Sequence, residues 1–266
     1  MREIDTGTDD LMARVEDGVA VLTLNRPDRR NALSRALLEG LASTLATVEV
    51  DDDVGAVVVT GAGGAFCAGG DVKDMASGAG AEVPWDVQVH RQRLNHRDTA
   101  GRLHRMPKPT IAFLPGAAAG AGLSLALACD LRYATSEAFM TTAFARVGFA
   151  GDYGGTWFLT RLVGPAKARE LYFFSERVGA DQALELGLVN AIETFAETVD
   201  RARRIAAGPR IAYRYMKENL NRSLTFPLEE VLDLEATHHL HTGTTEDHRE
   251  AAQAFAQKRE PTFHGR

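Results

Sequence analysis

Two stretches of small residues decide the fold: AFCAGGD at residues 65–71 and GAAAGAG at residues 116–122. Each follows a short apolar run that is typical of a buried strand, at 56–60 and at 110–114, and the second leads into an apolar helix from about residue 122 to 128. Small residues leave backbone N–H groups bare and let a ligand come close, as an oxyanion hole requires. The alternative is that the glycines only make tight turns.

Other glycine-rich loop chemistries fit these turns less well. A phosphate-binding P-loop needs Lys followed by Ser or Thr after its last glycine, and neither turn has that pair. The dinucleotide fingerprint needs a third glycine, whereas Leu123, Ser124 and Leu125 follow the second turn. The sequence contains no serine-hydrolase elbow and no His-Glu-x-x-His zinc motif. We therefore expect neither a nucleophilic serine nor a metal ion.

The surrounding pattern predicts an α/β protein with a helical C-terminal region. Residues 19–25 are β-branched and alternate as in a strand, and Ser34 then caps a helix with one apolar face. Residues 84–106 predict a polar helix. We expect an α/β core at 1–200 and a helical region at 201–266. Helical patterns dominate the last part of the chain, at 160–174, 180–186, 195–207, 211–221 and 228–256.

The composition is that of an ordinary globular protein, and it argues against several partners. Of the 266 residues 45% are hydrophobic, and the formal charge is −6 with Lys and Arg scattered, so no nucleic-acid partner is expected. Residues 111–131 are long enough to span a membrane, but their glycines, Pro115 and Asp130 favour a buried turn and helix. Two cysteines make no disulfide framework, and residues 1–10 do not resemble a secretory signal. We expect a cytoplasmic protein without a membrane partner.

Together with several further segments, the two turns resemble a known family. Residues 65–75, AFCAGGDVKDM, are similar to the CoA-binding and oxyanion segment of the crotonase (enoyl-CoA hydratase/isomerase) superfamily. Residues 24–33, LNRPDRRNAL, resemble its N-terminal signature, and residues 108–132 resemble its second oxyanion segment. The resemblance covers about residues 13–265, and such a series of segments is highly specific.

The resemblance implies the crotonase (ClpP-like) fold, a spiral of strand-strand-helix units with a helical C-terminal trimerisation region. It implies that Gly70 and Ala121 donate backbone N–H groups to the oxygen of an acyl-CoA thioester, each worth roughly 3 to 4 kcal/mol to the enolate. It also implies a homotrimer or a dimer of trimers, and no cofactor beyond the coenzyme A of the substrate. The positions that hold CoA in the family fall on Arg29, Ala32, Ala68, Asp71, Val72 and Lys73, and those that touch a neighbouring subunit's ligand fall on Phe263 and Arg266. The alternative for Arg29 and Lys73 is that they are solvated surface charges.

The sequence departs from the hydratases of this family at two positions of the acyl site. Those enzymes use two glutamates to position and activate the water that adds across the double bond. Ser124 and Phe144 stand at these positions, and neither can serve as a carboxylate base. Efficient hydration by the usual mechanism is therefore not expected.

A different carboxylate, Asp152, precedes the glycine pair in GDYGGT at residues 151–156. This segment resembles family members that shift double bonds in dienoyl-CoAs, or that isomerise ring-epoxide and oxepin CoA thioesters in the phenylacetate pathway. The resemblance implies an acyl-CoA isomerase with Asp152 as its base. Phe144, Phe149 and Trp157 are expected to give that carboxylate apolar surroundings. The alternative is a carboxylate that stabilises a turn or caps a helix.

Two other functions stay open: an enoyl-CoA hydratase (a lyase) of fatty-acid oxidation, and a non-catalytic acyl-CoA-binding relative. His90 and His96 lie on the segment that covers the acyl pocket in relatives, and some members place a catalytic histidine there. On so polar a helix we expect both to face solvent.

Overall fold

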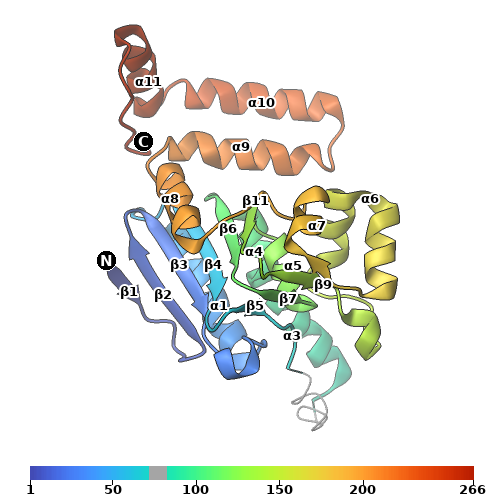
Figure 1. The fold of residues 1–266 in the computed structure, drawn as a ribbon. Helices are drawn as coiled ribbons and strands as arrows, with labels where there is room; N and C mark the ends of the chain where they lie inside the picture. Colours follow the sequence, from blue (N-terminus) through green and yellow to red (C-terminus); the bar gives the residue numbers. More distant parts are fainter. Residues whose placement is uncertain (72–82) are drawn as a thin grey trace.

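The computed structural model describes residues 1–71 and 83–266, and its largest element is a seven-stranded sheet (Figure 1). The first three strands are antiparallel, and the remaining strands pair in parallel, with Val21 opposite Val58 where the parallel part begins. The strand order is β1 (Arg2–Ile4), β2 (Leu11–Glu16), β3 (Val19–Leu24), β4 (Ala56–Gly61), β6 (Thr110–Leu114), β8 (Leu131–Ala134) and β11 (Ala191–Ile192).

A second, four-stranded sheet contains both glycine-rich turns. Its strands run in the order β10 (Val178–Gly179), β9 (Phe139–Thr141), β7 (Ala117–Ala119) and β5 (Ala65–Cys67). Strands β5 and β7 are parallel neighbours, with Ala65 opposite Ala117. Because both strands run the same way, the turns that follow them emerge at the same end of the sheet.

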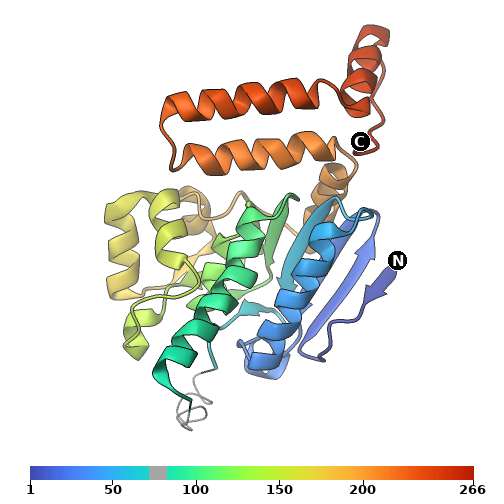
Figure 2. The same ribbon diagram turned by 180° about the vertical axis from the view of Figure 1, so that it is seen from behind.

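Helices cover both faces of the large sheet (Figures 1 and 2). On one face Leu22 packs in a core with Leu41 of α1, and on the other face Val21 and Val58 pack with Ala202 of α8. The helices are α1 (Arg35–Val50), α3 (Trp85–Asp98), α4 (Ala100–Arg105), α5 (Ala121–Leu127), α6 (Gly155–Phe174), α7 (Ala180–Glu185), α8 (Phe195–Ala206), α9 (Arg210–Ser223), α10 (Leu228–Thr242) and α11 (Glu246–Gln257), with the short 3₁₀ turns η1 (Pro27–Arg29) and η2 (Phe144–Val147).

Helix α1 forms as the sequence predicts. The Ser34 hydroxyl accepts a hydrogen bond from the Leu37 backbone N–H at 3.0 Å, which satisfies one donor of the first turn. The apolar residues of its predicted face are buried, except Leu38, which is partly buried.

Two predicted helices are each divided in the structure. Residues 84–106 form α3 and α4, because Thr99 has φ −113° and ψ −91° and interrupts the helix. Residues 228–256 form α10 and α11, and the Thr245 hydroxyl caps the new start by accepting from the His248 N–H at 3.1 Å.

The apolar stretch 111–131 contains the predicted strand, β6, and the predicted buried helix, α5, but residues 117–119 of the predicted turn form strand β7. Within the described ranges, no helix combines the length and the apolarity needed to cross a membrane.

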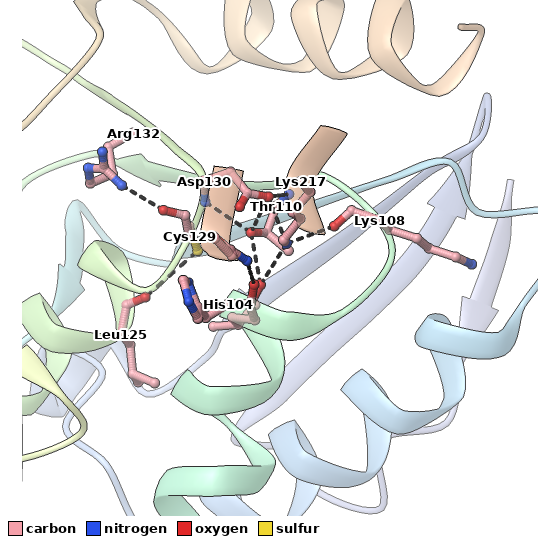
Figure 3. A network of polar contacts seen from close by, with 10 residues as sticks. His104, Lys108, Thr110, Leu125, Cys129, Asp130, Arg132 and Lys217 are labelled. Atoms are coloured by element: carbon pink, nitrogen blue, oxygen red, sulfur yellow. Dashed lines mark hydrogen bonds and ion pairs between the residues drawn. The ribbon is translucent and has the colours of Figure 1, made fainter. Parts of the chain in front are cut away.

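A buried lysine fastens the C-terminal helices to the core (Figure 3). Lys217 of α9 is 7% exposed, and its ammonium donates to the carbonyl oxygens of Leu103 and Lys108 at 2.9 and 3.0 Å. It also pairs with the carboxylate of Asp130 at 2.8 Å. The same carboxylate oxygen accepts the backbone N–H of Thr110 at 2.7 Å. All three ammonium protons thus have acceptors, as a buried charge requires.

Candidate active site

The two glycine-rich turns touch each other. Gly69 has φ +90°, and a Cβ at that position would lie 2.8 Å from the carbonyl oxygen of Ala119 and 3.4 Å from the backbone nitrogen of Ala121. Only glycine fits both the dihedral angle and the space. The close contact brings the peptide that leads into Gly70 beside the start of α5.

The N–H groups of Gly70 and Ala121 are available for a ligand. Among the described residues, neither group donates a hydrogen bond, although Ala121 is only 5% exposed and Gly70 is partly buried. Buried backbone donors are nearly always paired, so two unpaired donors at adjoining turns indicate a site for an oxygen acceptor.

The segments predicted to hold CoA are joined by backbone hydrogen bonds. Ala68 donates to the carbonyl of Arg30 at 2.9 Å, and Leu33 donates to the carbonyl of Gly69 at 2.8 Å. These bonds place Arg29, which is exposed, and Ala32, which is buried, on a segment that lies against the first turn.

Asp71 is 6% exposed, and its carboxylate contacts the guanidinium of Arg26 at 3.3 Å. This ion pair ties the end of the first turn to the segment before η1. Val72 and Lys73, also predicted to hold CoA, lie outside the described residues.

Asp152 lies in the loop before α6, and its side chain is 29% exposed. The backbone carbonyl of Asp152 accepts from the Gly155 N–H at 3.0 Å, and Gly154 caps α6 without any side-chain hydrogen bond. The carboxylate is therefore not the cap of α6, one of the alternatives considered above. Phe149 is 55% exposed to solvent, so the prediction that it gives the Asp152 carboxylate apolar surroundings is wrong.

The Asp152 carboxylate instead meets two side chains of α3 that sequence reasoning missed or misplaced. The Gln92 amide donates to Oδ2 at 2.9 Å. The Nε2 atom of His96 contacts Oδ1, and the His96 ring lies on the Tyr153 ring with centroids 4.5 Å apart. His90 is exposed as expected, whereas the prediction that His96 faces solvent is wrong, because its side chain is only 33% exposed.

Two tyrosines surround the Asp152 loop. Burial, and then the negative charge of Asp152, raises the pKa of Tyr172 to about 12. The same two causes raise the pKa of Tyr153 well above its usual range. Both phenols therefore keep their protons at neutral pH. The side chains of Tyr153 and Tyr172 are thus uncharged, and Asp152 is the group of this loop that can accept a proton.

Ser124 and Phe144, which stand at the expected glutamate positions, are buried at 1% and 7% exposure. The Ser124 hydroxyl donates to the Gly120 carbonyl at 3.3 Å and packs on Gly155, where a Cβ would lie 2.2 Å from it. Phe144 stacks on Tyr172 with centroids 5.9 Å apart. Neither position has a carboxylate or space prepared for one.

Phe263 and Arg266 belong to the last segment of the chain, whose C-terminal end lies near α8 and α11 (Figure 1). The guanidinium of Arg266 pairs with Glu246 of α11 at 2.8 Å, and Phe263 lines a small cavity with Pro209 and Ile211. Their predicted contact with a neighbouring subunit's ligand stays a prediction.

Comparison with known proteins decides the family. The chain matches the family described as Enoyl-CoA hydratase/isomerase over residues 14–266. It is 37% identical over 260 residues to the 1,2-epoxyphenylacetyl-CoA isomerase of Escherichia coli (strain K12), an alignment that covers 96% of this chain and 98% of that protein. The chain belongs to the enoyl-CoA hydratase/isomerase family.

The family includes relatives with different activities. The 4-chlorobenzoyl coenzyme A dehalogenase-2 of Arthrobacter sp. is 35% identical over 217 residues, which cover 80% of this chain and 78% of that protein. A solved enoyl-CoA hydratase from Polaromonas sp. JS666 has a TM-score of 0.89 and 33% identity, over 95% of this chain and 99% of that chain. These likenesses confirm the crotonase superfamily and the crotonase fold predicted from the sequence.

Proposed function

We propose that the protein is an acyl-CoA thioester isomerase that shifts a double bond through an enolate held in an oxyanion hole, with Asp152 as the base. The observation that supports this most is the carboxylate itself. The Asp152 carboxylate is partly buried and is held by Gln92 and His96. Gly155, three residues later in the chain, packs on Ser124 of helix α5. The likeness to a 1,2-epoxyphenylacetyl-CoA isomerase is consistent with this activity.

In the proposed reaction the thioester oxygen accepts hydrogen bonds from the N–H groups of Gly70 and Ala121. As a proton leaves the acyl chain, negative charge moves onto that oxygen, and the two fixed donors stabilise it more strongly than they stabilise the ground state. Asp152 takes the proton from one carbon and returns it to another, so the carboxylate is regenerated at the end of each turnover. The thioester supplies the acidity, and no further group is needed for these steps.

The test is to measure water uptake and double-bond migration separately, on crotonyl-CoA and on a 3-enoyl-CoA. We expect migration on the 3-enoyl-CoA, and hydration of crotonyl-CoA well below the usual enzyme range of about 10 per second. A hydration rate in that range would favour the hydratase function, and acyl-CoA binding without either reaction would favour the non-catalytic relative.

The proposal includes a homotrimer or a dimer of trimers in the cytoplasm. Helices α9 and α10 expose large apolar side chains, among them Leu220 at 68%, Leu228 at 67% and Leu240 at 72%, and such a surface favours association. Sedimentation should give a trimer or a hexamer, and an active monomer at micromolar concentration would contradict it. Cys67 and Cys129 are buried free thiols, which is consistent with a reducing compartment.

A further inference from the structure

Helix α3 meets the Asp152 loop through one short stretch of polar side chains. Gln92 and His96 are four residues apart, so they lie on the same face of the helix, and both are partly buried. None of the described residues of α3 is fully buried, so an apolar core does not hold this helix against the loop. The contacts with Asp152 and Tyr153 do so instead.

The polar contacts are divided unequally between the two carboxylate oxygens of Asp152. Oδ1 meets two donors: Nε2 of His96, and the Tyr153 backbone N–H at 3.1 Å. Oδ2 accepts a hydrogen bond only from the Gln92 amide, at 2.9 Å, among the residues described. Each oxygen of an ionised carboxylate has two lone-pair positions. Oδ1 therefore has two N–H groups beside it, whereas Oδ2 has one and keeps a lone-pair position open.

The contact also fixes the proton of the imidazole. Nε2 of His96 is buried and forms no hydrogen bond with regular geometry, and its one close polar contact among the described residues is the Asp152 carboxylate, which can accept a hydrogen but cannot donate one. Nε2 therefore carries hydrogen, whichever charge state the ring adopts. The Tyr153 ring lies against the imidazole and restricts its rotation.

We propose that His96 is a positioning residue that holds Oδ1 of Asp152, so that Oδ2 is the oxygen that takes and returns the substrate proton. This inference rests on the proposed function, because it assigns the atom through which Asp152 acts as a base. His96 keeps its own proton throughout the cycle. The proton removed from one carbon forms an O–H bond at Oδ2, and that bond breaks when the proton is delivered to the other carbon.

Three single variants of α3 test the role of His96. His96→Leu removes the donor and should lower kcat for double-bond migration about 10- to 100-fold, the range expected for a hydrogen bond to a charged group. KM should change little, because the CoA-binding segments are untouched. His96→Gln keeps an N–H donor and should recover most of the lost kcat. His90→Leu is the matched control: His90 is exposed on the same helix and forms no hydrogen bond, ion pair or ring contact with another described residue, so its kcat should equal that of the wild type.

Wild-type kcat in His96→Leu would overturn the positioning role, and so would an equal loss in His96→Leu and His96→Gln. Asp152→Asn, assayed beside them, separates this inference from the proposed function. If Asp152→Asn abolishes migration and His96→Leu does not affect it, only the role of His96 fails. If Asp152→Asn is fully active, the proposed base itself is wrong.

A crystal of the wild-type protein soaked with a 3-enoyl-CoA tests the choice of oxygen independently of any variant. Oδ2 should lie nearest to the carbon that loses its proton, and His96 should still contact Oδ1. Oδ1 nearest to that carbon would contradict the inference.

Discussion

In the proposed function, the two glycine-rich turns and the Asp152 loop use different kinds of chemical group. At the turns the proposed functional groups are backbone N–H donors, and the side chains around them matter chiefly by being small, as Gly69 against Ala119 shows. At the Asp152 loop the functional group is a side chain held by other side chains, Gln92 and His96. Replacing a side chain can change the second region without disturbing the first. The acyl-CoA chemistry of the family is therefore expected to depend on the turns, and the particular reaction on the loop.

The largest effect is expected from a substitution at the loop. Asp152→Asn keeps the shape of the side chain and removes the base, so migration should fall by about 100- to 10,000-fold. Affinity for the CoA thioester should hardly change, because the CoA-binding segments around Arg29 are untouched. Steady-state kinetics with a 3-enoyl-CoA and binding of a saturated acyl-CoA measure the two quantities. Equal losses in both would indicate a structural role for Asp152.

A substitution at the turns should have the next largest effect. Ala121→Pro deletes one N–H donor and should lower turnover by about 100- to 1,000-fold. Ala121 is the first residue of α5, where proline is well tolerated, so the fold should survive. Ala121→Ser keeps the N–H group and is the matched control. Unchanged turnover in a folded Ala121→Pro variant would remove this group from the site.

Restoring one carboxylate should have a small effect. Ser124→Glu replaces a hydroxyl that packs directly on Gly155, so the longer side chain has no prepared space. The partner position also remains Phe144, and the two glutamates of hydratases act as a unit. Hydration of crotonyl-CoA should therefore rise less than about tenfold. A hydration rate near the usual enzyme range in this variant would show that water is already positioned by other groups.

The smallest expected effect lies away from both regions, at His104. Burial lowers the pKa of His104, whose ring packs edge-on against Trp157 at 5.2 Å. The unfolded chain then binds a proton more readily than the folded chain below about pH 6.5, so the free energy of unfolding falls as the pH decreases from there. In His104→Phe this part of the pH dependence, between about pH 7.5 and 5.5, should disappear. Urea titrations at the two pH values measure it, and an unchanged pH dependence would argue against the lowered pKa.

The sequence predicted the turns better than the loop, and the difference has a physical cause. A turn of small residues between a buried strand and a helix is a local pattern, and so is the Ser34 cap, and the structure has both. The contact of Gln92 with Asp152 joins residues 60 positions apart, and no local pattern signals it. The polarity of α3 even suggested that His96 faces solvent. A glutamine and a histidine four residues apart, opposite an unexplained carboxylate, are the only signal that could have indicated the contact.

Helix boundaries in the C-terminal region were also hard to predict, because a single residue can decide them. The pattern at 228–256 is helical throughout, yet the chain turns after Thr242, and Thr245 starts α11. The sequence did not indicate the three hydrogen-bond acceptors of the buried Lys217 ammonium. Two of them are backbone carbonyl oxygens that only the fold brings near.

The most direct test of the division between the two regions is exchange of substrate hydrogens with deuterium oxide, followed by NMR at the α and γ carbons. With a 3-enoyl-CoA, the wild-type protein should catalyse exchange at both carbons. At equal saturation Asp152→Asn should lose about 100-fold or more of that exchange while still binding the thioester. Undiminished exchange in Asp152→Asn would mean that the base is a different residue, and it would contradict the assignment of proton transfer to the Asp152 loop.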